Sequence, residues 1–128
     1  MALLLDTHAF LWWVEDSQRL SRKARAAIGR PGDACYLSLG SCWEMAIKVS
    51  LGRLKIEGSV DRFIAQHMAA SGVQALPVRL PHVARVATLP FHHRDPFDRL
   101  LAAQALVEDL TIVSADSVFK RYGVSRIW

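Results

Sequence analysis

Long apolar stretches are the first thing that this sequence lacks. Its longest uninterrupted apolar runs, such as residues 9–14 and 2–5, fall far short of the ~20 residues that a membrane-spanning helix needs. The first residues contain no basic segment, and Asp6 interrupts the apolar stretch there, so a secretory signal is not expected. We therefore expect a protein without membrane association that resides in the cytoplasm.

Cysteine is scarce as well, and the chain has neither repeats nor low-complexity tracts. Its two cysteines, Cys35 and Cys42, make neither a disulfide framework nor a zinc site, and no set of cysteines and histidines has zinc-binding spacing. We interpret both as small buried thiols. With 52% hydrophobic residues and no linker, the 128 residues are predicted to form one domain over residues 1–128.

The charge balance is mildly basic. Lysine and arginine total 16 against 12 acidic residues, which gives a formal net charge of +4. Such an excess favours a polyanionic partner, either a nucleic acid or an acidic segment of another protein. This feature alone does not choose between the two.

Short apolar segments alternate with longer amphipathic ones along the chain. Strands are predicted at residues 2–5, 35–38, 73–78 and 111–114, with an edge strand at 124–127. Helices are predicted at residues 7–15, 22–28, 41–51, 60–70, 81–88 and 96–110, with a short one at 117–122. Strands separated by helices indicate an α/β fold with a parallel sheet covered on both faces. Ligands of such sheets bind beyond the carboxyl ends of the strands.

Four acidic residues occupy similar places in this predicted fold. Asp6 ends the first strand, and Asp116 lies just past the fourth. Glu44 lies one turn into the helix after the second strand, and Asp98 lies in the first turn of the helix that begins at Pro96. Because the carboxyl ends of parallel strands share one edge of the sheet, we expect these side chains to gather there.

Each acid taken alone has a simpler explanation as a helix cap. Asp6 and Asp116 could be N-caps, and residues 41–44, Ser-Cys-Trp-Glu, fit the capping box in which the glutamate reaches back to the cap. An acid in the first turn, such as Asp98, also suits the helix dipole. Capping acids would gather at the same sheet edge, so both interpretations stay open for each residue.

The four acids as a set point to a metal ion. Partly buried carboxylates that are brought together repel one another, and a hard divalent cation such as Mg²⁺ or Mn²⁺ relieves that repulsion. Metal ions held by carboxylates promote hydrolysis of phosphodiester bonds, with one or two ions in the site. The sequence does not decide between one ion and two.

Four segments carry a resemblance to a known family. They are Leu-Asp-Thr-His at residues 5–8, Ser-Cys-Trp-Glu at 41–44, Asp-Pro-Phe-Asp-Arg-Leu-Leu-Ala-Ala-Gln-Ala at 95–105 and Ser-Ala-Asp at 114–116. This pattern resembles the PIN-domain ribonucleases, and in particular the VapC-type toxins of bacterial toxin–antitoxin pairs. The resemblance covers essentially the whole chain.

The resemblance implies a Rossmann-like α/β/α sandwich and an endoribonuclease that depends on Mg²⁺ or Mn²⁺. It also implies a homodimer that a cognate antitoxin protein inhibits. The catalytic and metal-binding acids that it implies are Asp6, Glu44, Asp98 and Asp116. Thr7 and Ser114 would be hydroxyls that orient these carboxylates. A PIN-like module that binds RNA or protein without cleavage is the alternative, although such a module would be expected to lose some of the acids.

Asp95 is the ambiguous residue of the motif, three positions before Asp98. Pro96 lacks an N–H and suits the first helical position, so we predict that Asp95 is the N-cap and accepts a hydrogen bond from the N–H of Phe97 or Asp98. The side chain of Asp98 leans toward the start of the helix and is predicted to point at Asp6.

The remaining candidates are residues that could contact RNA. Lys48, Arg94 and Arg99 lie near the acids in sequence and are predicted to bind phosphate. His92 and His93 precede the motif, where they could touch RNA or simply be surface histidines. The tryptophans Trp12, Trp13 and Trp43 could stack on bases, but helical spacing favours packing in the core or at a dimer interface. The RNA target itself stays open.

Overall fold

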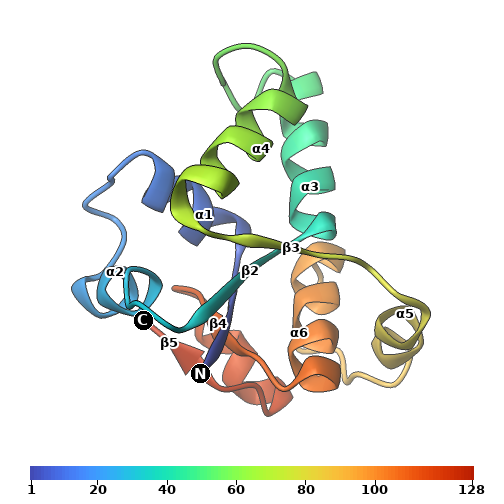
Figure 1. The fold of residues 1–128 in the computed structure, drawn as a ribbon. Helices are drawn as coiled ribbons and strands as arrows, with labels where there is room; N and C mark the ends of the chain where they lie inside the picture. The colour runs from blue at the N-terminus through green and yellow to red at the C-terminus, as the bar shows by residue number, and fades with distance from the viewer.

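Five short strands form one sheet in the computed structural model, which describes residues 1–128 (Figure 1). They are β1 (Ala2–Leu5), β2 (Ala34–Ser38), β3 (Gln74–Leu76), β4 (Thr111–Val113) and β5 (Arg126–Ile127). Their order is β3-β2-β1-β4-β5, and every pairing is parallel. The predicted parallel α/β sheet is therefore confirmed, and the earliest strand in the chain occupies its centre.

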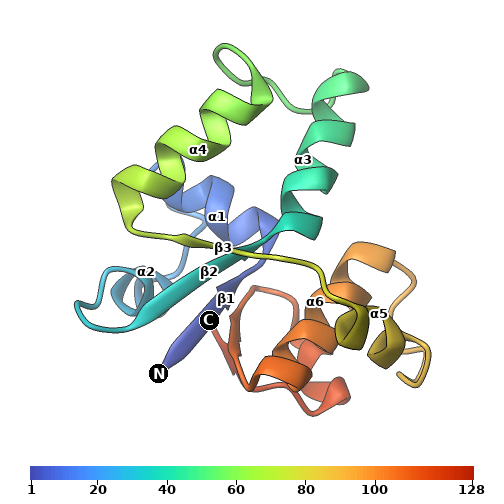
Figure 2. The same ribbon diagram turned by 45° about the vertical axis from the view of Figure 1, so that its right-hand side comes forward.

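Helices cover both faces of this sheet. They are α1 (Thr7–Val14), α2 (Arg22–Ile28), α3 (Leu39–Ser50), α4 (Val60–Ser71), α5 (Leu80–Val86), α6 (Pro96–Glu108) and the 3₁₀ helix η1 (Ser117–Tyr122). Figures 1 and 2 show α1 and α4 on one side of the sheet and α5 and α6 on the other. None of these helices combines the length and the apolar character that crossing a membrane requires.

The central strand shows how the sheet joins two cores. Leu3 and Leu5 are fully buried among side chains of α1, α2, α3 and α4, whereas Leu4 is fully buried among side chains of α6 and η1. Successive side chains of a strand point to opposite faces, so a strand covered on both faces must be apolar throughout. The Leu-Leu-Leu run of β1 meets that requirement and produces the α/β/α sandwich.

Helix α3 begins two residues earlier than the sequence indicates. Ser38 is its N-cap, because its Oγ accepts a hydrogen bond of 3.0 Å from the N–H of Gly40. The capping-box interpretation of residues 41–44 is therefore wrong, and Glu44 is free to make other contacts. Gly40 also allows α3 to pack closely on α6, because a Cβ at this position would lie 2.6 Å from Cδ2 of Leu100.

Other elements also differ from the prediction: β5 covers only two of the four residues predicted, and α5 covers Leu80–Val86, not residues 81–88. Strand β3 is only three residues long, since the backbone N–H of Val73 still bonds to Met68 at the end of α4, and Pro77, which has no N–H, follows the strand. The predicted short helix at residues 117–122 is present, but it is a 3₁₀ helix that ends at Gly123, whose φ of 79° lies in the left-handed region.

Candidate metal centre

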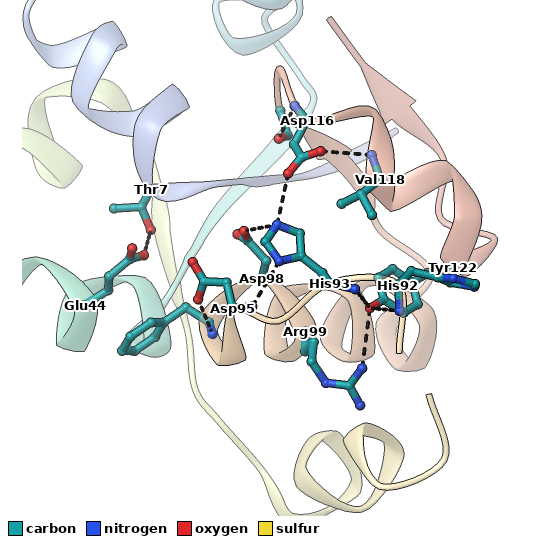
Figure 3. Close-up of polar contacts among 12 residues, drawn as sticks. Thr7, Glu44, His92, His93, Asp95, Asp98, Arg99, Asp116, Val118 and Tyr122 are labelled. Atoms are coloured by element: carbon teal, nitrogen blue, oxygen red, sulfur yellow. Dashed lines mark hydrogen bonds and ion pairs between the residues drawn. The ribbon is translucent and has the colours of Figure 1, made fainter. Parts of the chain in front are cut away.

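A hollow of about 270 Å³ lies where the carboxyl ends of β1 and β4 meet α1, α3 and the first turn of α6. Its lining includes the five acids of the predicted motifs and two of their predicted neighbours: Asp6, Glu44, Asp95, Asp98, Asp116, Thr7 and Lys48. We call this the acidic hollow; Figure 3 shows its polar contacts. The structure thus brings together residues that are up to about a hundred positions apart in the sequence.

Asp6 serves as a helix cap and as part of the hollow at the same time. Its Oδ1 accepts a hydrogen bond of 2.7 Å from the N–H of Ala9, which caps α1. Burial raises the pKa of Asp6, and the charge of Glu44 adds to this effect, while hydrogen bonds from Ser114 and Ala9 partly offset it. Capping and membership of an acidic cluster are therefore compatible for this residue.

Glu44 is buried and uses both of its oxygens. Oε1 accepts a hydrogen bond of 2.6 Å from the hydroxyl of Thr7, and Oε2 lies 2.9 Å from Nζ of Lys48, one helical turn further on. Thr7 contacts a carboxylate of the hollow as the motif leads one to expect. Lys48 places a cation at the wall of the same hollow.

Asp95 and Asp98 have different roles at the start of α6. Oδ1 of Asp95 accepts a hydrogen bond of 2.9 Å from the N–H of Phe97, so its predicted function as N-cap is confirmed. The side chain of Asp98 points into the hollow. Burial raises its pKa to about 7, and the charges of Asp95, Asp6 and Glu44 add to this effect while His93 opposes it. Asp98 is thus, like Asp6, a carboxyl group whose charged form is disfavoured both by burial and by neighbouring carboxylates.

His93 joins Asp98 to Asp116 across the hollow (Figure 3). Its Nε2 lies 3.1 Å from Oδ2 of each carboxylate. Its Nδ1 accepts a hydrogen bond of 3.0 Å from the N–H of Asp95, so the proton of the neutral ring must be on Nε2, where it can be donated to the acids. Oδ1 of Asp116 caps η1 through the N–H of Val118, and Ser114 accepts from the N–H of Asp116.

The loop that carries His93 is fixed by contacts with distant parts of the chain. The hydroxyl of Tyr122, in η1, accepts hydrogen bonds from the backbone N–H groups of His92 and His93 at 3.2 and 2.9 Å. The guanidinium of Arg99 donates to the carbonyls of Val86, Leu89 and Pro90. Sequence reasoning left the role of His93 open, and the one local signal was its place two residues before the N-cap of α6.

Two of the predicted phosphate-binding residues lie outside the acidic hollow. Arg99 is 7% exposed, and its guanidinium points away from the acids toward the loop carbonyls, so the prediction that it binds phosphate is wrong (Figure 3). Arg94 is exposed but lines a different hollow. Lys48 alone of the three lies beside the acids.

The side chains of the hollow suit a hard divalent cation. Five carboxylates and a threonine hydroxyl offer oxygen atoms, whereas both cysteines lie elsewhere. The imidazole of His93 presents a hydrogen, not a lone pair, to Asp98 and Asp116, so it would hold these carboxylates and would not be a ligand itself. The raised pKa of Asp98 indicates an excess of negative charge that a cation would relieve.

Comparison with known proteins agrees with this geometry. The family model described as PIN domain matches residues 3–125. Over 117 residues the chain is 29% identical to Ribonuclease VapC22 of Mycobacterium tuberculosis, a match that covers 89% of this chain and 86% of that protein.

Solved structures share the fold at low sequence identity. VapBC2 from Rickettsia felis, solved with a fragment of promoter DNA, superposes with a TM-score of 0.72 at 12% identity over 98% of this chain and 97% of that one. DNA-bound VapBC from Salmonella typhimurium gives a TM-score of 0.67 at 15% identity over 98% and 96%. Since the family model spans almost every residue, the chain belongs to the PIN domain family.

Proposed function

We propose that this protein is an endoribonuclease that acts as the toxin of a toxin–antitoxin pair. One observation carries the proposal: Asp6, Glu44, Asp98 and Asp116 converge on one hollow at the edge of the sheet. The relative named Ribonuclease VapC22 and the structural similarity to VapBC complexes support the same activity. Hydrolysis of an RNA phosphodiester bond is the reaction.

The acids are proposed to bind Mg²⁺ or Mn²⁺. Asp6, Asp98, Asp116 and Glu44 would hold the ion, which when bound supplies an activated water and neutralises charge on the phosphate. Hydrogen bonds from Ala9, Val118 and Thr7 fix one oxygen of three of these carboxylates. The second oxygens of Glu44 and Asp116 contact Lys48 and His93, so these carboxylates are held in a defined direction, which is what a metal site needs.

Two cations are proposed to guide the RNA backbone. Lys48 lies at the wall of the acidic hollow and neutralises part of the charge of Glu44, so a phosphate can approach without facing acids alone. Arg94 is exposed on the neighbouring loop. Both would bind phosphate without reading the base sequence. Ser114 would steady Asp6 and the turn before Asp116.

Protein partners are part of the proposal. The large apolar side chains Leu39, Trp43 and Leu51 of α3 and its end are exposed, with Trp43 64% exposed although it packs against Phe97. Apolar groups of this size on one helix favour a protein interface, which we assign to a homodimer. Light scattering should then give about twice the chain mass of 14.3 kDa. A cognate antitoxin, encoded beside the toxin, would block the acidic hollow.

Cleavage of RNA by purified protein tests the activity. Wild-type protein should cut RNA with Mn²⁺ or Mg²⁺, stop when EDTA is added and recover when metal is restored. Calorimetry should show Mn²⁺ binding that the variant Asp98→Asn loses. Cleavage that continues undiminished in EDTA, with the variant purified alongside as the contaminant control, would refute metal dependence; metal binding without cleavage of any RNA would favour a non-catalytic module.

Growth of cells that express the gene tests the toxin assignment. Expression of the wild-type chain alone should arrest growth, and co-expression of the neighbouring gene should restore it. Expression of Asp98→Asn should leave growth unaffected at the same protein level. Harmless expression of soluble, catalytically active protein would point instead to a housekeeping nuclease.

A further inference from the structure

A second hollow adjoins the acidic one and has the opposite character. Its volume is about 570 Å³, and its lining includes Phe91, His92, Arg94 and Pro96. The two hollows share a wall, because His93 lines the second one while its Nε2 bonds to Asp98 and Asp116 in the first. A molecule that lies across this wall would touch both.

The chemistry of the second hollow is cationic and aromatic. No acidic side chain lines it, whereas Arg94 and Arg99 both do. The ring of Phe91 is 91% exposed, with the guanidinium of Arg99 at 4.4 Å from its centroid. Since Arg99 is itself tied to three loop carbonyls, it holds Phe91 by a cation–π contact while most of the ring remains open to solvent.

We propose that this second hollow binds a base of single-stranded RNA next to the bond that is cut. This proposal rests on the proposed ribonuclease function. A phosphodiester held at the acids places the neighbouring nucleotide at the shared wall. Every base has a flat face that stacks on an aromatic ring, and the exposed Arg94 attracts the phosphate that follows. The volume lies within the ~300–1,000 Å³ that ligand pockets span.

An acidic peptide of another protein would also suit a cationic hollow. RNA is favoured because His93, which lines this hollow, bonds to Asp98 and Asp116, and an acidic peptide that crossed this wall would bring its carboxylates against those two acids. An RNA strand differs in that its bases stack on the exposed Phe91, a contact that needs no metal ion.

Binding of a short fluorescein-labelled single-stranded RNA, measured by fluorescence anisotropy in EDTA, tests the proposal without cleavage. Phe91→Leu should weaken binding about tenfold, while Phe91→Tyr should stay within about twofold of the wild type, because stacking depends on the ring. The matched control is Leu80→Ala on α5, which removes a side chain that is also largely exposed, at 79%, outside this hollow. That variant should bind as the wild type does.

A single abasic position scanned through the same RNA sharpens the test. At one position the missing base should weaken binding by the wild type about tenfold, and the same probe should cost Phe91→Leu nothing further, because both changes remove one stacking contact. Equal binding by wild type and Phe91→Leu would overturn the proposal. The proposal would also be overturned if the abasic change and Phe91→Leu weakened RNA binding independently at every RNA position. A Phe91→Leu variant that is impaired only in antitoxin binding would overturn it as well.

The same measurements separate failure of the base site from failure of the proposed function. If the Phe91→Leu variant binds RNA normally and cleaves it with Mn²⁺, the proposed base site is refuted and the proposed ribonuclease function stands. If Phe91→Leu and the abasic RNA weaken binding in EDTA as expected but no RNA is cleaved, the base site stands and the ribonuclease function is refuted. A wild-type chain that neither binds nor cuts RNA would overturn both.

Discussion

At each end of helix α6, a histidine accepts a backbone N–H on Nδ1 and contacts carboxylate through Nε2, but the two histidines have different roles. At the C-terminal end, His82 accepts a hydrogen bond on Nδ1 from the N–H of Arg79 and bonds through Nε2 to Glu108 at 2.9 Å. At the N-terminal end, His93 accepts on Nδ1 from the N–H of Asp95 and bonds through Nε2 to Asp98 and Asp116. In both, a backbone N–H fixes which ring nitrogen faces the acid.

The difference lies in how many acids meet the histidine. His82 is fully buried against one carboxylate and holds α5 against α6, so both ring nitrogens have a hydrogen-bond partner. His93 faces two carboxylates, with Asp6 and Glu44 close enough to raise the pKa of Asp98 further. The same local geometry is therefore a complete structural contact at one end of α6 and, at the other, part of an acidic cluster that we propose binds a cation.

The largest effect is expected from a change in the acidic hollow, at the N-terminal end of α6. Asp98→Asn should lower metal-dependent RNA cleavage at least about a hundredfold, because several kcal/mol of transition-state stabilisation depend on the bound ion. Glu108→Gln, the corresponding change at the other end, should leave cleavage within about twofold. Initial rates of the folded variants on one RNA substrate give the measurement.

Asp95→Ala supplies the matched control three residues away. It should lose about 0.5–2 kcal/mol of stability as a missing cap and keep measurable cleavage. A well-folded but inactive Asp95→Ala together with an active Asp98→Asn would reverse the roles assigned to the two residues.

The second prediction concerns His82, at the C-terminal end of α6. His82→Ala should lower the free energy of unfolding by about 2–4 kcal/mol, because it opens a cavity and leaves the N–H of Arg79 and the carboxylate of Glu108 without their partner. Cleavage per folded molecule should stay near the wild-type level. Urea unfolding followed by circular dichroism measures the loss. A change of less than about 0.5 kcal/mol in the free energy of unfolding would contradict a stabilising role for the His82–Glu108 contact.

The third prediction uses the pH dependence of the metal-free protein. The pKa of Asp98, about 7 in the folded state against 3.8 as its ordinary value, means that its ionisation opposes folding as pH rises from about 4 to 7. Asp98→Asn should therefore match the wild type at pH 4 and be more stable above pH 7, by about 2 kcal/mol. This is less than the roughly 4 kcal/mol that the full shift implies, because the metal-free site can relax.

Thermal unfolding in EDTA across this pH range gives the measurement, with Asp109→Asn at the far end of α6 as the control. A stabilisation that is constant with pH would contradict the crowding of charge around Asp98.

The smallest effect concerns the histidine itself. His93→Ala should weaken Mn²⁺ binding about tenfold, because Asp98 and Asp116 lose the donor that orients them. His93→Gln, which retains an N–H donor, should recover part of the affinity. Calorimetry measures both, and His92→Ala is the control because its ring packs on Tyr122 and contacts no carboxylate. Equal Mn²⁺ affinities for all three variants and the wild type would remove His93 from the site.

The convergence of the acids could be predicted because it follows from one rule of parallel sheets. Asp6 and Asp116 follow neighbouring strands, so their meeting depends only on recognising β1 and β4 as buried strands. The N-cap role of Asp95 followed from Pro96, whose missing N–H fits the first helical position. These features depend on local sequence and topology, which a single sequence contains.

The errors came from contacts between distant residues. Arg99 directly follows Asp98, but consecutive helical residues point in different directions, and carbonyls of the loop before α6 capture its guanidinium. The role of His93 depends on a loop conformation that Tyr122 fixes from nearly thirty residues away. The sequence pattern places Ser38 in a strand and indicates only Ser41 as the cap of α3, whereas Ser38 is the residue whose Oγ accepts from the N–H of Gly40.

The position of β1 at the centre of the sheet has a consequence for the timing of synthesis. A ribosome releases Asp6 long before β4, Asp116 and Tyr122, and β1 cannot pair with β4 until these have emerged. A nascent chain therefore carries its acids apart, and its histidine loop has no anchor. Any activity that needs all of these acids therefore arises only after β4 and the residues up to Tyr122 have left the ribosome.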